Sequence, residues 1–260
     1  MPLFKAIDQT GYTVNIPDYP ERIISLVPSQ SELLFHLGLE ERVIGITRFC
    51  VHPEHWRRNK TRVGGTKKLH LDKIAALEPD LVLANKEENT KEEIEFLRTK
   101  FNVWTSDILT MDDNLEMITQ VSKMVGESSK GQLLCDSISS KINQLKINPR
   151  GSALYVIWKN PIMAAGRDTY INTMLELSGY INIMPNSDSH LRYPELLEED
   201  LIKMNPDNIL LSSEPFPFSE KHLDEFRKLV PNSRVKLVDG EMFSWYGSRT
   251  LEAINYMLQI

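Results

Sequence analysis

The sequence predicts an α/β protein of two lobes, each built on a mostly parallel sheet. Three observations predict it. Apolar strand-like runs alternate with amphipathic helical runs, two long helical stretches interrupt this alternation after Asp112, and the alternation then restarts. The chain has 260 residues, enough for two small domains. We therefore expect an N-terminal lobe over residues 1–126, a connecting long helix over 127–148 and a C-terminal lobe over 149–260.

The N-terminal lobe opens with a predicted hairpin of strands 4–7 and 13–16, followed by strand 23–26. Ser29 and Glu32 have the spacing of a capping box for a helix over 31–37, which Gly38 would end. The expected elements after it are strand 43–46, helix 71–77, strand 81–84, a helix from Thr90 to about residue 100 and strand 103–105.

The middle of the chain predicts helices 114–125 and 128–147, broken near Gly126, with no strand signal between them. The sequence PRG at 149–151 ends the second helix. The C-terminal lobe then predicts strand 154–158, helix 170–177, strand 209–211, helix 221–229, strand 235–238 and helix 250–258.

The two lobes repeat one another weakly. The sequence IAALEPDLVL at 74–83 matches LIKMNPDNIL at 201–210, and ELLFHLG at 32–38 echoes TMLELSG at 173–179. Any two α/β units share such features, but the common Pro-Asp position favours an internal duplication. Two similar lobes that face each other would enclose a cleft, a frequent place for a small ligand.

Composition and motifs exclude several classes of protein. The net charge of -6, with scattered Lys and Arg, argues against a nucleic-acid partner. The sequence contains no GxSxG, Walker, GxGxxG or HExxH motif, so we expect no catalytic residues, no cofactor and no enzyme. His52 and His55 flank Pro53 and favour a surface loop over a metal site. We expect Cys50 and Cys135 to be free thiols, although a disulfide stays open.

Loops that follow strands hold the candidate ligand residues, because the carboxyl ends of parallel strands line the ligand crevice in α/β proteins. Six are aromatic: Phe49, Trp158, Tyr193, Phe216, Trp245 and Tyr246. Glu241 and Arg249 flank the last two and would orient a flat ligand that stacks on the rings. Asn85 and Lys86 open a polar loop, and residues 212–216 occupy the repeat-related place. For any single aromatic the alternative is the core.

The motifs resemble a known family. RIISLVPSQSELL at 22–34, LEPDLVL at 77–83, WKNP at 158–161 with Ala165-Gly166, and GSR at 247–249 are similar, in order, to the vitamin B12 and iron–siderophore solute-binding proteins of ABC importers, the helical-backbone metal receptors. The resemblance covers nearly the whole chain. It implies two Rossmann-like lobes joined by a single long rigid helix, with the ligand cleft between them.

The resemblance also implies a function. Family members reversibly bind a corrinoid, haem or ferric siderophore and deliver this small metal chelate to an ABC permease dimer in the membrane. Phe49 and Tyr193 align with aromatic cleft positions of the B12-binding members. Thr66 and Asn85 fall where those members carry Trp, so the chain departs from the B12 pattern and the ligand is left open.

The family docks on its permease through one acidic residue on each lobe, and the aligned residues are Asp72 and Glu199. Each lies seven residues before the Pro of its repeat, Pro79 or Pro206, so the two carboxylates are repeat-equivalent. A partner with two-fold symmetry would suit this arrangement. The alternative is that both acids merely favour a helix N-terminus.

The resemblance implies a monomer in the periplasm or at the cell surface. The chain shows neither a signal segment nor an apolar run long enough to cross a bilayer, so a cytoplasmic carrier or sensor of the same fold is the alternative. A metallocluster enzyme built on related lobes ranks last, because it would need more Cys or His ligands than the sequence supplies.

Overall fold

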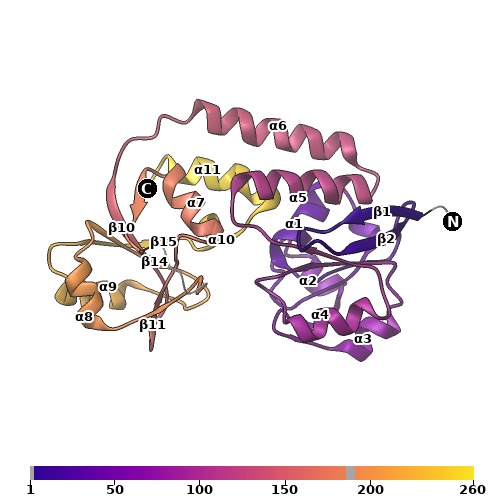
Figure 1. Cartoon of the computed structure of the whole chain (residues 1–260), viewed down its shortest axis with the longest axis horizontal. Coiled ribbons are helices and arrows are strands. Elements are labelled where there is room, and N and C mark those ends of the chain that lie inside the picture. The colour runs from indigo at the N-terminus through magenta and orange to yellow at the C-terminus, as the bar shows by residue number, and fades with distance from the viewer. Residues whose placement is uncertain (1–2, 186–190) are drawn as a thin grey trace. The chain divides into compact units, whose positions relative to one another are not determined.

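The computed structural model describes residues 3–185 and 191–260, and the chain forms two compact α/β units (Figure 1). The first unit contains residues 3–108, 112–140 and 246–249. The second contains residues 109–111, 141–185, 191–245 and 250–260. The predicted α/β class with two lobes is confirmed.

A five-stranded parallel sheet with the order β5-β4-β3-β8-β9 forms the centre of the first unit. Its strands are β3 (Ile23–Ser25), β4 (Val43–Ile46), β5 (Thr61–Arg62), β8 (Leu81–Asn85) and β9 (Val103–Ser106). Two antiparallel hairpins accompany the sheet: β1 (Leu3–Ile7) with β2 (Thr13–Pro17), and β6 (Gly64–Gly65) with β7 (Lys68–Leu69). Every residue of β3 and β8 is buried, as a parallel sheet covered on both faces requires.

Helices α1 (Pro28–His36), α2 (Trp56–Asn59) and α4 (Lys91–Arg98) follow strands of this sheet. Helix α3 (Leu71–Ala76) follows the β6–β7 hairpin, and η1 (Glu40–Arg42) is a single 3₁₀ turn. The long helices α5 (Met111–Met124) and α6 (Ser128–Gln144) come next. The division between the units falls within α6, between Ser140 and Lys141, so this helix carries the chain from the first unit to the second.

The first helix does not begin as predicted. The expected capping box of Ser29 and Glu32 is wrong, because α1 starts at Pro28 with Val27 as its N-cap and no side chain caps it. Proline favours the first position of a helix, since its fixed φ suits the helix and its missing N–H would be unpaired there in any case. Ser29 is consequently buried inside the helix, and Glu32 pairs with Arg249 instead.

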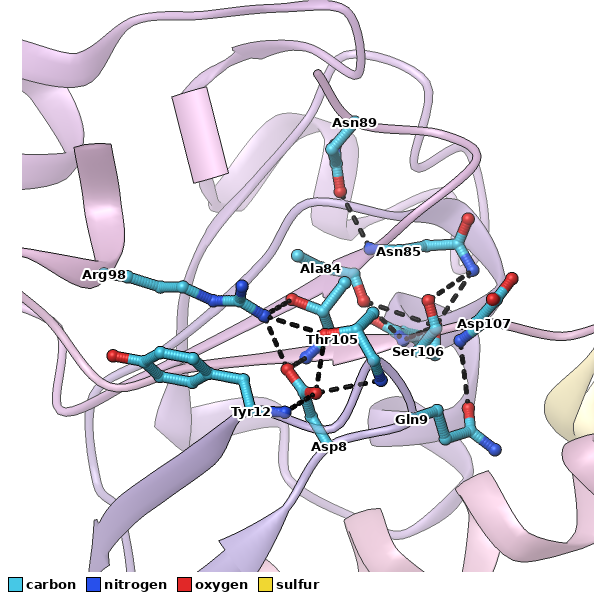
Figure 2. Close-up of polar contacts among 12 residues, drawn as sticks. Asp8, Gln9, Tyr12, Ala84, Asn85, Asn89, Arg98, Thr105, Ser106 and Asp107 are labelled. Atoms are coloured by element: carbon cyan, nitrogen blue, oxygen red, sulfur yellow. Dashed lines mark hydrogen bonds and ion pairs between the residues drawn. The ribbon is translucent and has the colours of Figure 1, made fainter. Parts of the chain in front are cut away.

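Asp8 fastens the N-terminal hairpin to the edge strand β9 (Figure 2). Its buried carboxylate accepts a hydrogen bond from the backbone N–H of Thr105 at 3.2 Å and pairs with Arg98 at 2.6 Å. It also accepts from the backbone N–H groups of Thr10 and Tyr12 in the hairpin turn. One carboxylate therefore shapes the turn and attaches it to the sheet.

The sheet of the second unit has the order β13-β11-β10-β14-β15, and β12 also pairs with β10. The strands are β10 (Gly151–Trp158), β11 (Ile162–Ala164), β12 (Tyr180–Asn182), β13 (Glu195–Leu196), β14 (Asn208–Ser212) and β15 (Arg234–Val238). The pairs of β10 with β12 and β14, and of β14 with β15, are parallel. Helices α7 (Tyr170–Leu177), α8 (Glu198–Met204), α9 (Glu220–Leu229), α10 (Glu241–Ser244) and α11 (Thr250–Met257) complete the fold, with the 3₁₀ turn η2 (Gly247–Arg249) in the first unit.

Some short elements were absent from the prediction. Strands β11 and β13 pair antiparallel at the edge of the sheet and span only a few residues each, too few for a periodic pattern. Residues 241–249, expected as a loop, contain α10 and η2. Helix α7 has the bounds that the sequence predicts.

Four parallel strands have the same arrangement in each sheet. In the first unit β4, β3, β8 and β9 are neighbours in that order, and in the second unit β12, β10, β14 and β15 are. Glu78 and Asn205 both have left-handed backbones, with φ of 42° and 43°, directly before Pro79 and Pro206. A shared strained position at the same place supports an internal duplication.

The Asp that follows each of these prolines makes an equivalent contact. Asp80 accepts hydrogen bonds from the backbone N–H groups of Glu21 and Arg22, at 2.8 and 3.0 Å, just before β3. Asp207 accepts one from the backbone N–H of Ser152 in β10, at 2.7 Å. The hydrogen bonds that the backbone N–H and the hydroxyl of Ser152 donate lower the pKa of Asp207. The Pro-Asp repeat in the sequence therefore reflects one structural device used twice.

Candidate ligand-binding site

An exposed aromatic and a cation lie together after β4 in the first unit. The Phe49 side chain is 46% exposed, and the Arg48 guanidinium lies 4.8 Å from the centre of its ring. Both side chains rest on Gly65, where a Cβ atom would come within 3.2 Å of the Phe49 ring and 3.3 Å of Arg48. Glycine at residue 65 therefore lets this stacked pair lie against the backbone, and the pair can take part in stacking and in binding an anion.

Asn85 and Lys86 follow β8, and the structure gives them different surroundings. Asn85 is buried, its Nδ2 donates to Ser106 Oγ at 3.0 Å (Figure 2), and its Oδ1 accepts from the backbone N–H groups of Glu87 and Glu88. It therefore shapes the loop that it opens. Lys86 is exposed and pairs with Asp107 at 2.5 Å. A ligand contact of either residue stays a prediction.

The segment Tyr246–Arg249 belongs to the first unit. Arg249 is buried, and its Nε and Nη2 atoms each lie 2.9 Å from an oxygen of the Glu32 carboxylate. The backbone N–H of Gly247 donates to the buried Asn114 Oδ1 at 2.7 Å, and the Tyr246 hydroxyl lies 3.5 Å from Ser106 Oγ. Burial raises the pKa of Tyr246 well above its ordinary value. The guanidinium of Arg249 is thus engaged by a carboxylate, and its predicted ligand role stays a prediction.

In the second unit, Trp158 ends β10 with 38% of its surface exposed. Its ring meets Phe216 edge-on, with centroids 5.6 Å apart, and Phe216 in turn packs against Phe218 at 4.6 Å. Phe216 is half-buried against the apolar core, so it lies between this core and Trp158. Tyr193, the third predicted aromatic of this unit, is half-buried.

Trp245 caps the end of α10, and its ring is buried. Its Nε1–H donates to Glu214 Oε1 at 2.9 Å, and Ser244 Oγ donates to the same oxygen at 2.8 Å. Burial raises the pKa of Glu214, and the carboxylate of Glu241 raises it further. Glu214 was missed in the prediction, although its loop occupies the repeat-related place of Asn85 and Lys86 and could have been found by that signal.

Asp72 and Glu199 are both exposed, and each is the second residue of a helix, α3 or α8. Their repeat equivalence therefore extends from the sequence to the helix position.

Beside α8 the second unit has a surface groove of about 530 Å³, bordered by Ile162, Leu196, Leu197, Glu198, Phe226 and Leu229. None of the predicted ligand residues lines this groove.

Metal ligands do not gather anywhere in the described residues: no group of three or more His, Cys, Asp or Glu side chains could hold an ion. His55 Nε2 lies 2.7 Å from Oε1 of Glu40, so its contact is with a single carboxylate. Cys50 and Cys135 are buried free thiols, as predicted. Over residues 3–185 and 191–260, no helix has the length and apolar character to cross a bilayer.

Comparison with known proteins decides the family. The family described as "Periplasmic binding protein" matches residues 23–232. The chain belongs to this family. Its members are solute-binding proteins and not enzymes, so the predicted role as the substrate-binding receptor of an ABC importer is confirmed.

Individual proteins are similar to this chain over most of its length. An uncharacterized ABC transporter substrate-binding lipoprotein, YvrC of Bacillus subtilis, is 24% identical over 97% of this chain and 83% of its own length. The periplasmic vitamin B12 binding protein BtuF of Vibrio cholerae has the same fold, with a TM-score of 0.78 and 23% identity over 93% of this chain and 96% of that one. The petrobactin-binding protein YclQ of Bacillus subtilis has a TM-score of 0.82 at 17% identity and covers 100% of both chains.

Proposed function

We propose that this periplasmic binding protein carries a corrinoid, haem or ferric siderophore to a permease dimer in the membrane. The observation that carries the proposal is an exposed aromatic at the carboxyl end of each sheet, Phe49 in the first unit and Trp158 in the second. Exposed rings on fixed strand ends suit a flat or aryl-bearing ligand, because stacking contributes about 0.5–1.5 kcal/mol per ring pair beyond area burial.

Charge supports a ligand with anionic and polar edges. Arg48 lies over Phe49 in the first unit, whereas Glu214 and Glu241 lie beside Trp245 in the second. A metal chelate brings its own metal, so the protein needs only rings and hydrogen-bonding groups to hold it. The relatives named for vitamin B12 and for petrobactin bind ligands of this kind. Thr66 and Asn85 stand where B12-binding relatives have Trp, which favours a siderophore or haem over B12.

In this proposal the receptor works outside the cytoplasmic membrane, as a monomer and without nucleic acid. Asp72 and Glu199 dock on the permease, one carboxylate for each subunit of the dimer. The support is their exposure and their equivalent position in the two repeats.

A binding screen with three defined probes tests the ligand class: cyanocobalamin, hemin and ferric desferrioxamine B. Each is added to the purified chain, and thermal unfolding and titration calorimetry are recorded. We expect one probe to bind with 1:1 stoichiometry and to raise the unfolding temperature. A ligand at 100 times its Kd stabilises the native state by about 2.7 kcal/mol. If none of the three probes binds, the proposed ligand class is rejected.

A further inference from the structure

Glu214 is closely surrounded by other residues of the second unit, directly after β14. Gly240 lies so close that a Cβ atom on it would be 2.5 Å from Glu214 Cγ and 2.5 Å from Ser212 Oγ. The backbone N–H of Glu214 donates to Ser212 Oγ at 3.3 Å, and Tyr155 donates to the same hydroxyl at 3.1 Å. Any side chain at residue 240 would displace the Glu214 side chain. The fold therefore reserves space for this carboxylate at the carboxyl end of the sheet.

The two carboxylate oxygens have different surroundings. Oε1 accepts both the Trp245 Nε1–H and the Ser244 hydroxyl, which fixes the carboxylate and the indole with respect to each other. Oε2 has no hydrogen-bond partner among the residues that the structure describes. It is absent from the set of fully buried side-chain atoms that lack a partner, so part of its surface is accessible to solvent. Oε1 thus forms hydrogen bonds within the protein, and Oε2 reaches the surface beside Trp245.

The charge on Glu214 is unfavourable for the fold. Burial is the largest cause that raises its pKa, and the carboxylates of Glu241 and Asp239 act in the same direction. The hydrogen bonds from Ser244 and Trp245 oppose this shift without cancelling it. A neutral glutamine could accept the same two hydrogen bonds through its amide oxygen. The fold by itself therefore does not require a carboxylate here, and a charge retained at such a place is typical of a functional site.

We propose that Glu214 is a ligand-binding residue of this receptor, whose Oε1 orients the Trp245 indole and whose Oε2 accepts a hydrogen bond from an N–H or O–H group of the ligand. The inference deepens the proposed function, on which its ligand contact rests. It names the ligand chemistry at this place: a hydrogen-bond donor or cationic group beside the aromatic surface. Amide N–H and ammonium groups supply it, and a bare carboxylate does not.

Protonation would reverse the chemistry of the exposed oxygen. Because Oε1 already accepts two hydrogen bonds, the proton goes to Oε2, which then becomes a donor. The folded-state pKa lies above the ordinary value of 4.5, so acidification through it stabilises the fold while it removes the acceptor from the ligand. Fold stability and affinity for a donor ligand should therefore change in opposite directions as the pH falls.

Two variants and one control test the proposal: Glu214→Gln, Glu214→Ala, and Glu220→Gln at an exposed position of α9. The first measurement uses the ligand-free chain, in which the Trp245 indole N–H signal is followed by ¹⁵N NMR from pH 7 to pH 4. We expect this signal to titrate in the wild type and in Glu220→Gln. The transition should vanish in Glu214→Gln. A Trp245 signal that is independent of pH in the wild type overturns the proposal without any ligand.

The second measurement compares unfolding temperature with affinity for whichever of the three probes binds the wild type. We expect Glu214→Gln to unfold at or above the wild-type temperature at pH 7 and yet to bind about ten-fold more weakly, the usual effect of losing a hydrogen bond to a charged group. Glu214→Ala should bind more weakly still, because the indole is released as well. Unchanged affinity in Glu214→Gln overturns the proposal, as does a loss of affinity that only accompanies a lower unfolding temperature. If no probe binds the wild type, the proposed function fails, and the indole titration alone decides whether Glu214 is coupled to Trp245.

Discussion

Single buried polar residues hold the loops on which the candidate site depends. Asn89 Nδ2 donates to the backbone oxygen of Thr66 at 3.0 Å, and its Oδ1 accepts from the backbone N–H of Asn85 at 2.9 Å. It therefore joins the loop after β8 to the loop after β6. Such residues contribute through the high cost of leaving buried polar groups unpaired. The more exposed Phe49 and Trp158 are the residues that we propose to contact a ligand.

Trp245→Ala is expected to weaken ligand binding by about 1–3 kcal/mol, because a buried aromatic anchor is lost. Titration calorimetry with the bound probe measures the effect, and Trp245→Phe serves as control, since it keeps a ring and loses only the hydrogen bond to Glu214. A folded Trp245→Ala variant with wild-type affinity would assign Trp245 to the core.

Asp72→Ala and Glu199→Ala are expected to leave both the unfolding temperature and the ligand affinity nearly unchanged, because both side chains are exposed and exposed charges contribute little to stability. Transport should fall, and more in the double variant than in either single one. Uptake of ligand by vesicles that contain the cognate permease measures this. The difference in transport between variant and wild type should shrink at higher salt, because salt screens the charge pairs that only the wild type makes. Normal delivery by the double variant would contradict a docking role.

Between elements, the contact of α5 with α6 shows how one residue type permits close packing. A Cβ atom on Gly131 would lie 2.0 Å from Ser122 Oγ, and Cys135 Sγ lies 3.6 Å from the backbone oxygen of Leu115. The two helices therefore pack closely at the place where α6 carries glycine. This contact fixes the first part of the helix that carries the chain from the first unit to the second.

Gly131→Ala is expected to destabilise the fold by about 1–3 kcal/mol, because the added methyl group has to displace Ser122. Chemical denaturation measures the free energy of unfolding. The double variant Gly131→Ala, Ser122→Gly should recover most of the loss, since it removes the atom that the methyl group meets. If Gly131→Ala has wild-type stability, the helices are packed less closely than the structure shows.

At the scale of the whole molecule, the first unit is completed by a segment from near the end of the chain. Tyr246–Arg249 packs with residues 3–108 and 112–140, although its neighbours on both sides in the sequence belong to the second unit. The pair of Arg249 with Glu32 joins residues 217 positions apart, and both side chains are largely buried, with 7% and 16% exposed. The first unit is therefore incomplete in any fragment that ends before residue 246.

Arg249→Ala is expected to destabilise the whole chain by about 3–5 kcal/mol, because it removes the guanidinium that pairs with the largely buried Glu32 carboxylate. Thermal denaturation by calorimetry measures this. The double variant Glu32→Met, Arg249→Met should recover much of the loss, since it removes both charges. If Arg249→Ala loses ligand affinity but keeps its stability, Arg249 contributes to ligand binding and not to the fold.

The sequence by itself determined the family, the α/β class and the duplicated organisation, because each depends on local order along the chain. Runs of apolar residues locate the parallel strands, Pro79-Asp80 and Pro206-Asp207 mark the repeat, and residues 170–177 have the period of a helix. The start of α1 was mispredicted because two local signals competed, and Pro28 had the stronger effect.

Only the tertiary structure decided which distant polar groups meet. Glu32 has the spacing of a capping residue but pairs with Arg249, and Glu214 accepts the indole N–H of Trp245 across 31 positions. Edge strands β11 and β13 could not be predicted from the sequence either. Their own residues show no strand pattern, and they are strands only because they pair with a neighbouring strand. The physical reason is the same in each case. Periodicity and turn residues depend only on the nearest few residues, whereas each of these contacts exists only after the sheet of its own unit has formed and has brought that unit's loops together.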